Sequence, residues 1–152
     1  MIQRIQSVYL LLAGLIPAIC IFIPLARFSV GEGYYTMYSF KYDVVGLSST
    51  TTGHPWGVLT FLLLAGVLSI YTIFCFKNRK RQMLLCKTVV VSHILFYVAY
   101  VAYSVAFASR TGADFCPVWL AALPLLSLVF ATLAGKAVKR DDDLIKSADR
   151  IR

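Results

Sequence analysis

Four long apolar runs fill more than half of the chain and predict four helices. Each run has 19 to 21 residues and contains no Asp, Glu, Lys or Arg. A helix rises about 1.5 Å per residue, so each run is roughly 30 Å long, the thickness of a bilayer's hydrocarbon core. The pattern predicts an all-α membrane protein, a bundle of four transmembrane helices in a single domain covering 1–152. The predicted spans are 8–26, 57–76, 88–108 and 115–135.

The loop between the first two spans, 27–56, has a different pattern that favours β-structure. Aromatic and β-branched residues flank a Gly-x-Gly turn, as they do in a β-hairpin. Farther along, Tyr38, Phe40 and Tyr42 occupy alternate positions and would share one face of a strand. Two strands alone are marginally stable. We therefore expect 28–44 to form a small extracytoplasmic β-hairpin that caps the outer ends of the helices.

Prolines near the ends of the runs refine this picture. Pro24-Leu25-Ala26 closes the first run without the small-residue pattern of a cleavage site, so we expect an uncleaved first helix rather than a signal peptide. Pro124 lies inside the fourth run, and we expect it to bend that helix near the bilayer centre.

The net charge of +8 is sorted by loop, which is typical of a membrane protein and not of a nucleic-acid-binding one. Twelve Lys and Arg residues fall on the side of the two termini, and three fall on the other side. By the positive-inside rule, both termini and the tail 136–152 are cytoplasmic. A basic cluster between the second and third spans is expected to meet anionic lipid headgroups. It comprises Lys77, Arg79, Lys80 and Arg81.

Cysteines and histidines give no metal or cofactor signature. The four cysteines form no C-x-x-C pair, and we expect them to be free. The predicted topology separates His54 from His93, so it leaves no histidine cluster for a metal. We expect no cofactor.

One polar face inside a predicted span is the candidate site for intramembrane chemistry. His93 is the only His, Asp, Glu, Lys or Arg well inside a span, and such residues are functional candidates by default. Tyr97, Tyr100 and Ser104 follow it at i+4, i+7 and i+11, so all four lie on one helical face. Two interpretations stay open. Neutral His93 bonds a neighbouring helix, or the face lines a polar cavity that binds a ligand or a proton.

The cytoplasmic tail is the candidate docking segment. Aspartates cluster at its start and basic residues recur toward its end, an order that suits the helix dipole. Leu144, Ala148 and Ile151 stand at i, i+4 and i+7 and give one apolar face, with Asp149 and Arg150 beside it. We expect 143–152 to form a short amphipathic helix that docks on the membrane surface or on a partner. The alternative is a frayed, solvated tail.

The opening stretch M-I-Q-R-I-Q-S-V-Y-L-L-L-A and the closing stretch D-L-I-K-S-A-D-R-I-R resemble an uncharacterised family. It consists of small four-helix inner-membrane proteins of Bacteroidetes, catalogued as a domain of unknown function. The resemblance covers the chain in length and span order and implies a bacterial inner-membrane location, but no activity and no catalytic residue. Both stretches would form one cytoplasmic patch if the first and last helices are neighbours.

Three functions are weighed on this basis. A non-enzymatic membrane adaptor or accessory subunit fits the distinctive ends and the lack of a soluble domain, with a protein partner or a second copy as its target. A lipid-, quinone- or small-molecule-binding protein, or an oligomeric transporter, would use the face of His93, Tyr97 and Tyr100. A membrane enzyme would need paired outer cysteines or a second buried ionisable group, and neither is found.

Overall fold

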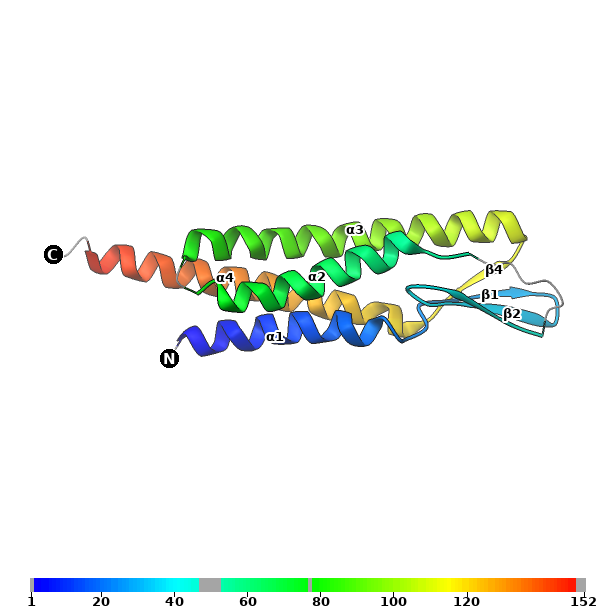
Figure 1. Ribbon diagram of the computed structural model, residues 1–152, viewed down its shortest axis with the longest axis horizontal. Coiled ribbons are helices and arrows are strands. Elements are labelled where there is room, and N and C mark those ends of the chain that lie inside the picture. Colours follow the sequence, from blue (N-terminus) through cyan, green and yellow to red (C-terminus); the bar gives the residue numbers. More distant parts are fainter. Residues whose placement is uncertain (1, 47–52, 77, 150–152) are drawn as a thin grey trace.

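The computed structural model describes residues 2–46, 53–76 and 78–149, without the side chains of 2–4, 148 and 149. Within these residues, four helices lie side by side and a small sheet covers one end of them (Figure 1). The helices are α1 (Ile2–Cys20), α2 (Trp56–Phe74), α3 (Arg79–Thr111) and α4 (Leu123–Asp149). The start of α1 and the end of α4 lie at the same end of the bundle, opposite the sheet (Figure 1).

Small residues bring the helices close together. α1 packs against α4 and α2, and α3 packs against the same two helices. Gly14 of α1 faces Gly66 of α2, and a Cβ added to Gly14 would lie 3.3 Å from the Gly66 carbonyl oxygen and 2.9 Å from Cγ1 of Ile70. Even alanine at Gly14 would therefore push the two helices apart. Small residues at crossings are characteristic of helices that pack in lipid.

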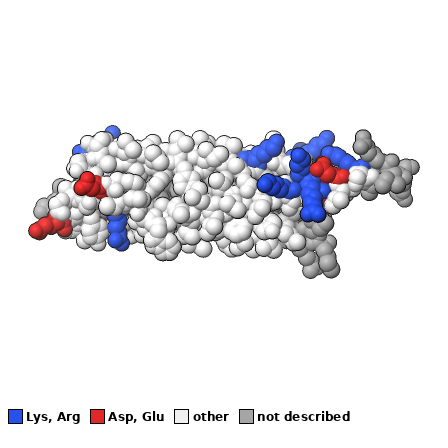
Figure 2. All heavy atoms as spheres, turned by 180° about the vertical axis from the view of Figure 1, so that it is seen from behind, with Lys and Arg blue, Asp and Glu red and all other residues white. Residues whose placement is uncertain are grey.

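Three helices are long and apolar enough to cross a membrane by length and composition. They are α2, α3 and the segment Trp119–Ser147, whereas the described apolar part of α1, Ile5–Cys20, is shorter. Large apolar side chains stay exposed along the bundle, for example Val98 at 60% and Val105 at 63%. The middle of the face seen in Figure 2 carries no Lys, Arg, Asp or Glu. An apolar surface of this extent indicates association with a membrane.

The sheet has four antiparallel strands in the order β3-β2-β1-β4. The loop between α1 and α2 supplies β1 (Ala26–Val30), β2 (Gly33–Met37) and β3 (Tyr42–Val45). The loop between α3 and α4 supplies β4 (Asp114–Pro117), which pairs with β1. The sheet therefore joins two connections that are far apart in the sequence.

The predicted fold class is wrong, because the strands form a four-stranded sheet and not a hairpin. The first turn, between Val30 and Gly33, does join two paired strands. The second strand was expected to continue to Tyr42 but ends at Met37, and the Tyr38 N–H donates to the Lys41 carbonyl across a turn, at 2.8 Å. Tyr38 and Phe40 thus lie in this turn while Tyr42 opens β3, and the three side chains do not share a strand face.

The helix ends also differ from the predicted spans. α1 ends at Cys20, and residues up to Ala26 lead into β1, so the run 8–26 is not one helix. The run 115–135 begins instead in β4 and continues through a short 3₁₀ helix, η1 (Trp119–Ala122). Pro124 is the second residue of α4, where its missing N–H has no helical partner to lose, so it does not bend the middle of the helix.

An aromatic cluster fastens the sheet to α3. Phe28 of β1 is fully buried, and its ring centroid lies 4.9 Å from that of Phe107 and 5.5 Å from that of Phe115. Tyr42 of β3 stacks on Phe107 with centroids 4.2 Å apart. Burial raises the pKa of Tyr42 to about 12, so its phenol stays neutral at physiological pH. Tyr35 of β2 also packs on Phe107, with centroids 5.3 Å apart, so one ring of α3 contacts three strands of the sheet.

The Phe28→Ala substitution should lower the free energy of unfolding by about 3–5 kcal/mol, the usual cost of removing a fully buried phenylalanine. Chemical denaturation in detergent, followed by circular dichroism, measures the change. Val45→Ala is the control, because Val45 lies in the same sheet but is 46% exposed. Its cost should stay within about 0.5 kcal/mol. Equal losses of stability in the two variants would show that burial of Phe28 does not fasten the sheet to α3.

Candidate functional site

His93 lies in a chain of hydrogen bonds that joins three helices. Its side chain is fully buried, and Nδ1 lies 2.9 Å from the carbonyl oxygen of Val89, one turn earlier in α3. Nε2 lies 2.7 Å from Oγ of Ser127 in α4. Ser127 in turn donates to the carbonyl oxygen of Ala13 in α1, at 2.7 Å. These contacts fix α1, α3 and α4 relative to one another.

The three contacts need three protons, and a neutral histidine and a serine supply two. The carbonyl oxygens of Val89 and Ala13 only accept. Because Ser127 donates its single hydroxyl proton to Ala13, the contact with His93 requires a proton on Nε2. Nδ1 then has no proton for Val89 unless the ring is an imidazolium. With a neutral imidazole, one of the three contacts is therefore a close approach without a hydrogen bond.

Tyr97 and Tyr100 bond the connecting segments at the end of the bundle that carries the sheet. The Tyr97 hydroxyl donates to the carbonyl oxygen of Ala121 in η1, at 2.9 Å. The Tyr100 hydroxyl donates to the carbonyl oxygen of Leu25, immediately before β1, at 3.0 Å. Both tyrosines thus bond the main chain of connecting segments.

Ser104 completes the predicted face, and its hydroxyl lies 3.8 Å from Sδ of Met37 in β2. With Tyr100 it also lines a mostly apolar hollow of about 430 Å³ beside β4, and neither His93 nor Tyr97 belongs to that lining. The structure therefore divides the predicted polar face into two parts. His93 belongs to the helix junction, Tyr97 bonds η1, and Tyr100 and Ser104 contact the sheet or the residue just before it.

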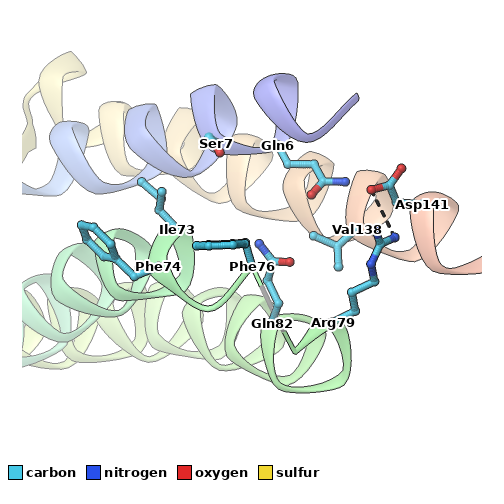
Figure 3. Close-up of a pocket in the computed structure, with 9 residues that line it drawn as sticks. All are labelled: Gln6, Ser7, Ile73, Phe74, Phe76, Arg79, Gln82, Val138 and Asp141. Atoms are coloured by element: carbon cyan, nitrogen blue, oxygen red, sulfur yellow. Dashed lines mark ion pairs between the residues drawn. The ribbon is translucent and has the colours of Figure 1, made fainter. Parts of the chain in front are cut away.

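A second polar site lies at the end of the bundle opposite the sheet. It is a cleft of about 420 Å³ at the ends of all four helices (Figure 3). We call it the basic-end cleft. Its lining consists of Gln6, Ser7, Ile73, Phe74, Phe76, Arg79, Gln82, Val138 and Asp141.

Two glutamines on opposite sides of the cleft connect neighbouring helices (Figure 3). Both are only 5% exposed. Gln6 of α1 donates from Nε2 to the Ala137 carbonyl oxygen in α4 at 3.2 Å, and Gln82 of α3 donates to that of Thr72 in α2 at 3.5 Å. Each amide also has a carbonyl oxygen and a second N–H besides the proton used in this bond. Such groups can both donate to and accept from a polypeptide main chain.

An ion pair closes one side of the cleft. Arg79 Nη1 lies 3.2 Å from Asp141 Oδ2, and both side chains are largely buried. Nη1 is enclosed, and despite this distance it makes no hydrogen bond to any residue that the structure describes. The ion pair therefore links α3 to α4 across this side of the cleft.

The predicted docking residues of the tail lie at and beyond the end of α4. Leu144 is 49% exposed, and α4 reaches Asp149 without a break, so the tail extends the last bundle helix. The side chains of Ala148 and Asp149, and the whole of Arg150 and Ile151, lie outside the described residues.

The predicted headgroup cluster is divided in a similar way. Lys80 and Arg81 are exposed, whereas Arg79 is paired with Asp141. Lys77 lies outside the described residues. Among the described residues, no three His, Cys, Asp or Glu side chains are grouped so that they could hold a metal ion.

The cleft unites residues that the sequence analysis did not connect. α1 and α4 are neighbours, and the Gln6 bond to Ala137 joins the two terminal segments. Arg79 and Gln82 lie at the start of α3 and had no predicted place beside them. The available signal was the position of Gln6 and Gln82 at the edges of apolar helices, where an amide is well placed to bond a neighbouring helix.

A double-mutant cycle on His93→Ala and Ser127→Ala should give a coupling free energy of about 0.6 kcal/mol, with an upper bound near 1.7, as for other hydrogen bonds between membrane helices. His93→Gln keeps a hydrogen-bonding group and should cost about 1 kcal/mol of stability. Reversible unfolding in mixed micelles provides both values.

Thr88→Ala is the matched control for the cycle, because the exposed Thr88 hydroxyl bonds only the Leu84 carbonyl of its own helix. Its effect should add to that of His93→Ala without coupling. If His93 and Ser127 also show no coupling, the hydrogen-bonded chain does not hold the helices together.

The similarity to known proteins concerns the whole sequence and not one site. No curated protein matches it. The sequence matches a family described as a domain of unknown function, DUF4293, over residues 2–151. The match extends from the start of α1 to the segment that follows α4 and so covers every helix and strand described above. The chain therefore belongs to the DUF4293 family.

Proposed function

We propose that the protein is a non-enzymatic adaptor or accessory subunit of a larger complex in a bacterial inner membrane, and that a protein partner docks on the basic-end cleft. The observation that carries the proposal is the cleft itself, in which two buried amides, an arginine–aspartate ion pair and two exposed phenylalanines meet. Arginine and exposed aromatic residues are enriched where proteins bind each other. Phe74 and Phe76, which line the cleft, are 71% and 56% exposed.

The charge distribution supports a cytoplasmic location for the cleft. Lys and Arg gather at the end of the bundle that holds the helix termini (Figure 2). The opposite end carries a mixture of both signs around the sheet. Under the positive-inside rule, the basic end faces the cytoplasm and the sheet faces outward. The start of α1 and the end of α4 then lie on the cytoplasmic side together.

The polar interior supports an adaptor more than a binding pocket. Tyr97, Tyr100 and Ser127 each bond a main-chain carbonyl oxygen of a neighbouring segment. His93 is fully buried and bonded within the same network. Since these groups already have partners inside the bundle, binding of an outside molecule there would have to break structural contacts.

One observation favours a second function, the binding of a proton at His93. The contacts around this residue lack one proton when the imidazole is neutral, so protonation would strengthen the junction of α1, α3 and α4. His93→Gln separates the two functions. An adaptor should retain its activity in cells with this substitution, whereas a proton-dependent protein should lose activity at normal abundance.

The proposed orientation predicts opposite reactivity for two single cysteines in intact spheroplasts. In a chain without native cysteines, Glu32→Cys should react with a membrane-impermeant maleimide, because Glu32 is exposed in the turn between β1 and β2. Ser147→Cys, exposed near the end of α4, should react only after lysis. The reverse pattern would refute the orientation. The four native residues to replace are Cys20, Cys75, Cys86 and Cys116.

The docking proposal predicts that Gln6→Leu with Gln82→Leu reduces the capture of a stoichiometric partner at least about tenfold, since two central interface contacts together exceed 1.4 kcal/mol. Pulldown in mild detergent with quantitative mass spectrometry gives the ratio. The control is Thr60→Val with Thr88→Val, because both hydroxyls are exposed and bond their own helix.

The tail is tested in parallel by Leu144→Asp with Ile145→Asp, which removes two exposed apolar side chains near the end of α4. A loss of capture in this variant alone would move the docking surface from the cleft to the tail. If neither variant changes the set of captured proteins, the adaptor proposal fails.

A further inference from the structure

A groove runs between α3 and α4 on the surface of the bundle. Its volume is about 670 Å³, and Val90 and Val91 of α3 form one wall. α4 contributes the small residues Ala131 and Gly135 to the lining. A Cβ on Gly135 would lie 3.4 Å from that of Cys86, so the two helices touch there. The groove exists because α4 places no large side chain beside this contact.

Three lysines surround one end of this groove. Lys87 of α3 and Lys136 and Lys139 of α4 all line it and are exposed. α3 and α4 run in opposite directions, and the contact between Cys86 and Gly135 sets the three lysines near one level. None of the three forms an ion pair with a residue that the structure describes. The described lining contains no Asp or Glu.

We propose that the groove binds one anionic phospholipid, with the phosphate held by Lys87, Lys136 and Lys139 and an acyl chain lying along Val90, Val91 and Ala131. The inference rests on the membrane placement proposed above but is independent of the docking partner. Both helices are long and apolar enough to cross a membrane, so the groove opens toward lipid. The lysines lie at its cytoplasmic end, where basic pockets between helices bind anionic headgroups.

Charge and shape together favour this occupant over others. A second copy of the chain would cover three unpaired lysines with an apolar helix, which would remove their hydration without supplying an anion. A free phosphate ion would leave the apolar part of the groove unfilled. A zwitterionic lipid would fill the groove but carry a positive group toward the lysines. An anionic phospholipid satisfies both parts.

Binding in this groove differs from a general electrostatic attraction of anionic lipid to the basic surface. Lys80 and Arg81 are exposed at the start of α3 and do not line the groove. They can contribute to a diffuse positive potential, but they do not adjoin an apolar channel. If the groove is a specific binding site, removing two positive charges from its lysines should weaken lipid binding more than removing the two charges of Lys80 and Arg81.

Native mass spectrometry of the full chain in mild detergent tests the proposal. Phosphatidylglycerol should bind as a single retained molecule, and phosphatidylcholine with the same acyl chains should bind at least about tenfold more weakly. Lys136→Gln with Lys139→Gln should weaken phosphatidylglycerol binding about tenfold or more. Lys80→Gln with Arg81→Gln removes the same charge and should change binding less than about twofold.

A second pair of variants tests the acyl-chain part of the groove. Thr132→Trp places an indole in the groove and should abolish retention of the lipid, because Thr132 belongs to its lining. Leu133→Trp is the control, since Leu133 is the next residue of α4, is 37% exposed and lies outside the groove. It should bind lipid as the unmodified chain does.

Four results would overturn the proposal. Equal losses in the two charge-removal variants would show diffuse attraction, and full retention in Thr132→Trp would show that the groove is not used. Thermal stabilisation by inorganic phosphate equal to that by phosphatidylglycerol would show an anion site without an acyl chain. A dimer that Thr132→Trp dissociates would show that a second copy occupies the groove.

Discussion

Polar groups in the interior of this bundle must find partners within the protein, and the arrangement of the helices depends on that constraint. The middle of the bundle presents apolar side chains outward, so hydrophobic burial alone gives little preference for one helix arrangement in lipid. Ser69 and Thr72 satisfy their hydroxyls on their own helix, and they therefore leave the neighbouring helices free to shift. Ser127 instead bonds α1 while it contacts His93 of α3. This side chain specifies which turn of each helix lies beside the others.

The same constraint explains why the sheet forms at the end of the bundle opposite the helix termini. If the connections between the helices were irregular, some of their main-chain N–H and C=O groups would lack hydrogen-bond partners. Pairing of β1 with β4 provides main-chain hydrogen bonds to the α1–α2 connection and to the α3–α4 connection at the same time. Tyr100 and Ser39 then bond the carbonyl oxygens of Leu25 and Cys20, on either side of the short link from α1 to β1. The sheet is consequently part of the helix packing and sets the positions of the helix ends.

Hydropathy predicts where helices lie but not where the chain leaves them. The runs 57–76 and 88–108 correspond closely to α2 and to the apolar part of α3, because a long uncharged run has few other stable conformations. Phe115 and its neighbours are just as apolar, yet they form β4, because a strand from a distant loop is available to pair with them. Apolar composition favours burial without specifying helix or strand. Pairing over a separation of about 90 residues leaves no periodic signal in a single sequence.

The candidate site, too, could be predicted only in part from the sequence. The helical spacing of His93, Tyr97, Tyr100 and Ser104 correctly places them along one side of α3, but their roles depend on which segments meet them. The basic-end cleft depends still more on tertiary structure, since Gln6, Gln82 and Asp141 come from three different helices. Only the packing of α1 on α4, and of α2 on α3, brings them together.

The interior and the basic end of the bundle therefore have different capacities for function. In the interior, hydroxyl and imidazole groups are bonded to specific neighbours, and any change there alters the helix arrangement. At the basic end, Gln6 and Gln82 keep amide groups beyond those used in their bonds to neighbouring helices, and three lysines beside α3 and α4 have no described ion-pair partner. Groups without internal partners are the ones that gain most from an external one. Under the proposed functions, binding of lipid and protein at this end would therefore require no rearrangement of the interior, which can remain a fixed support for both surfaces.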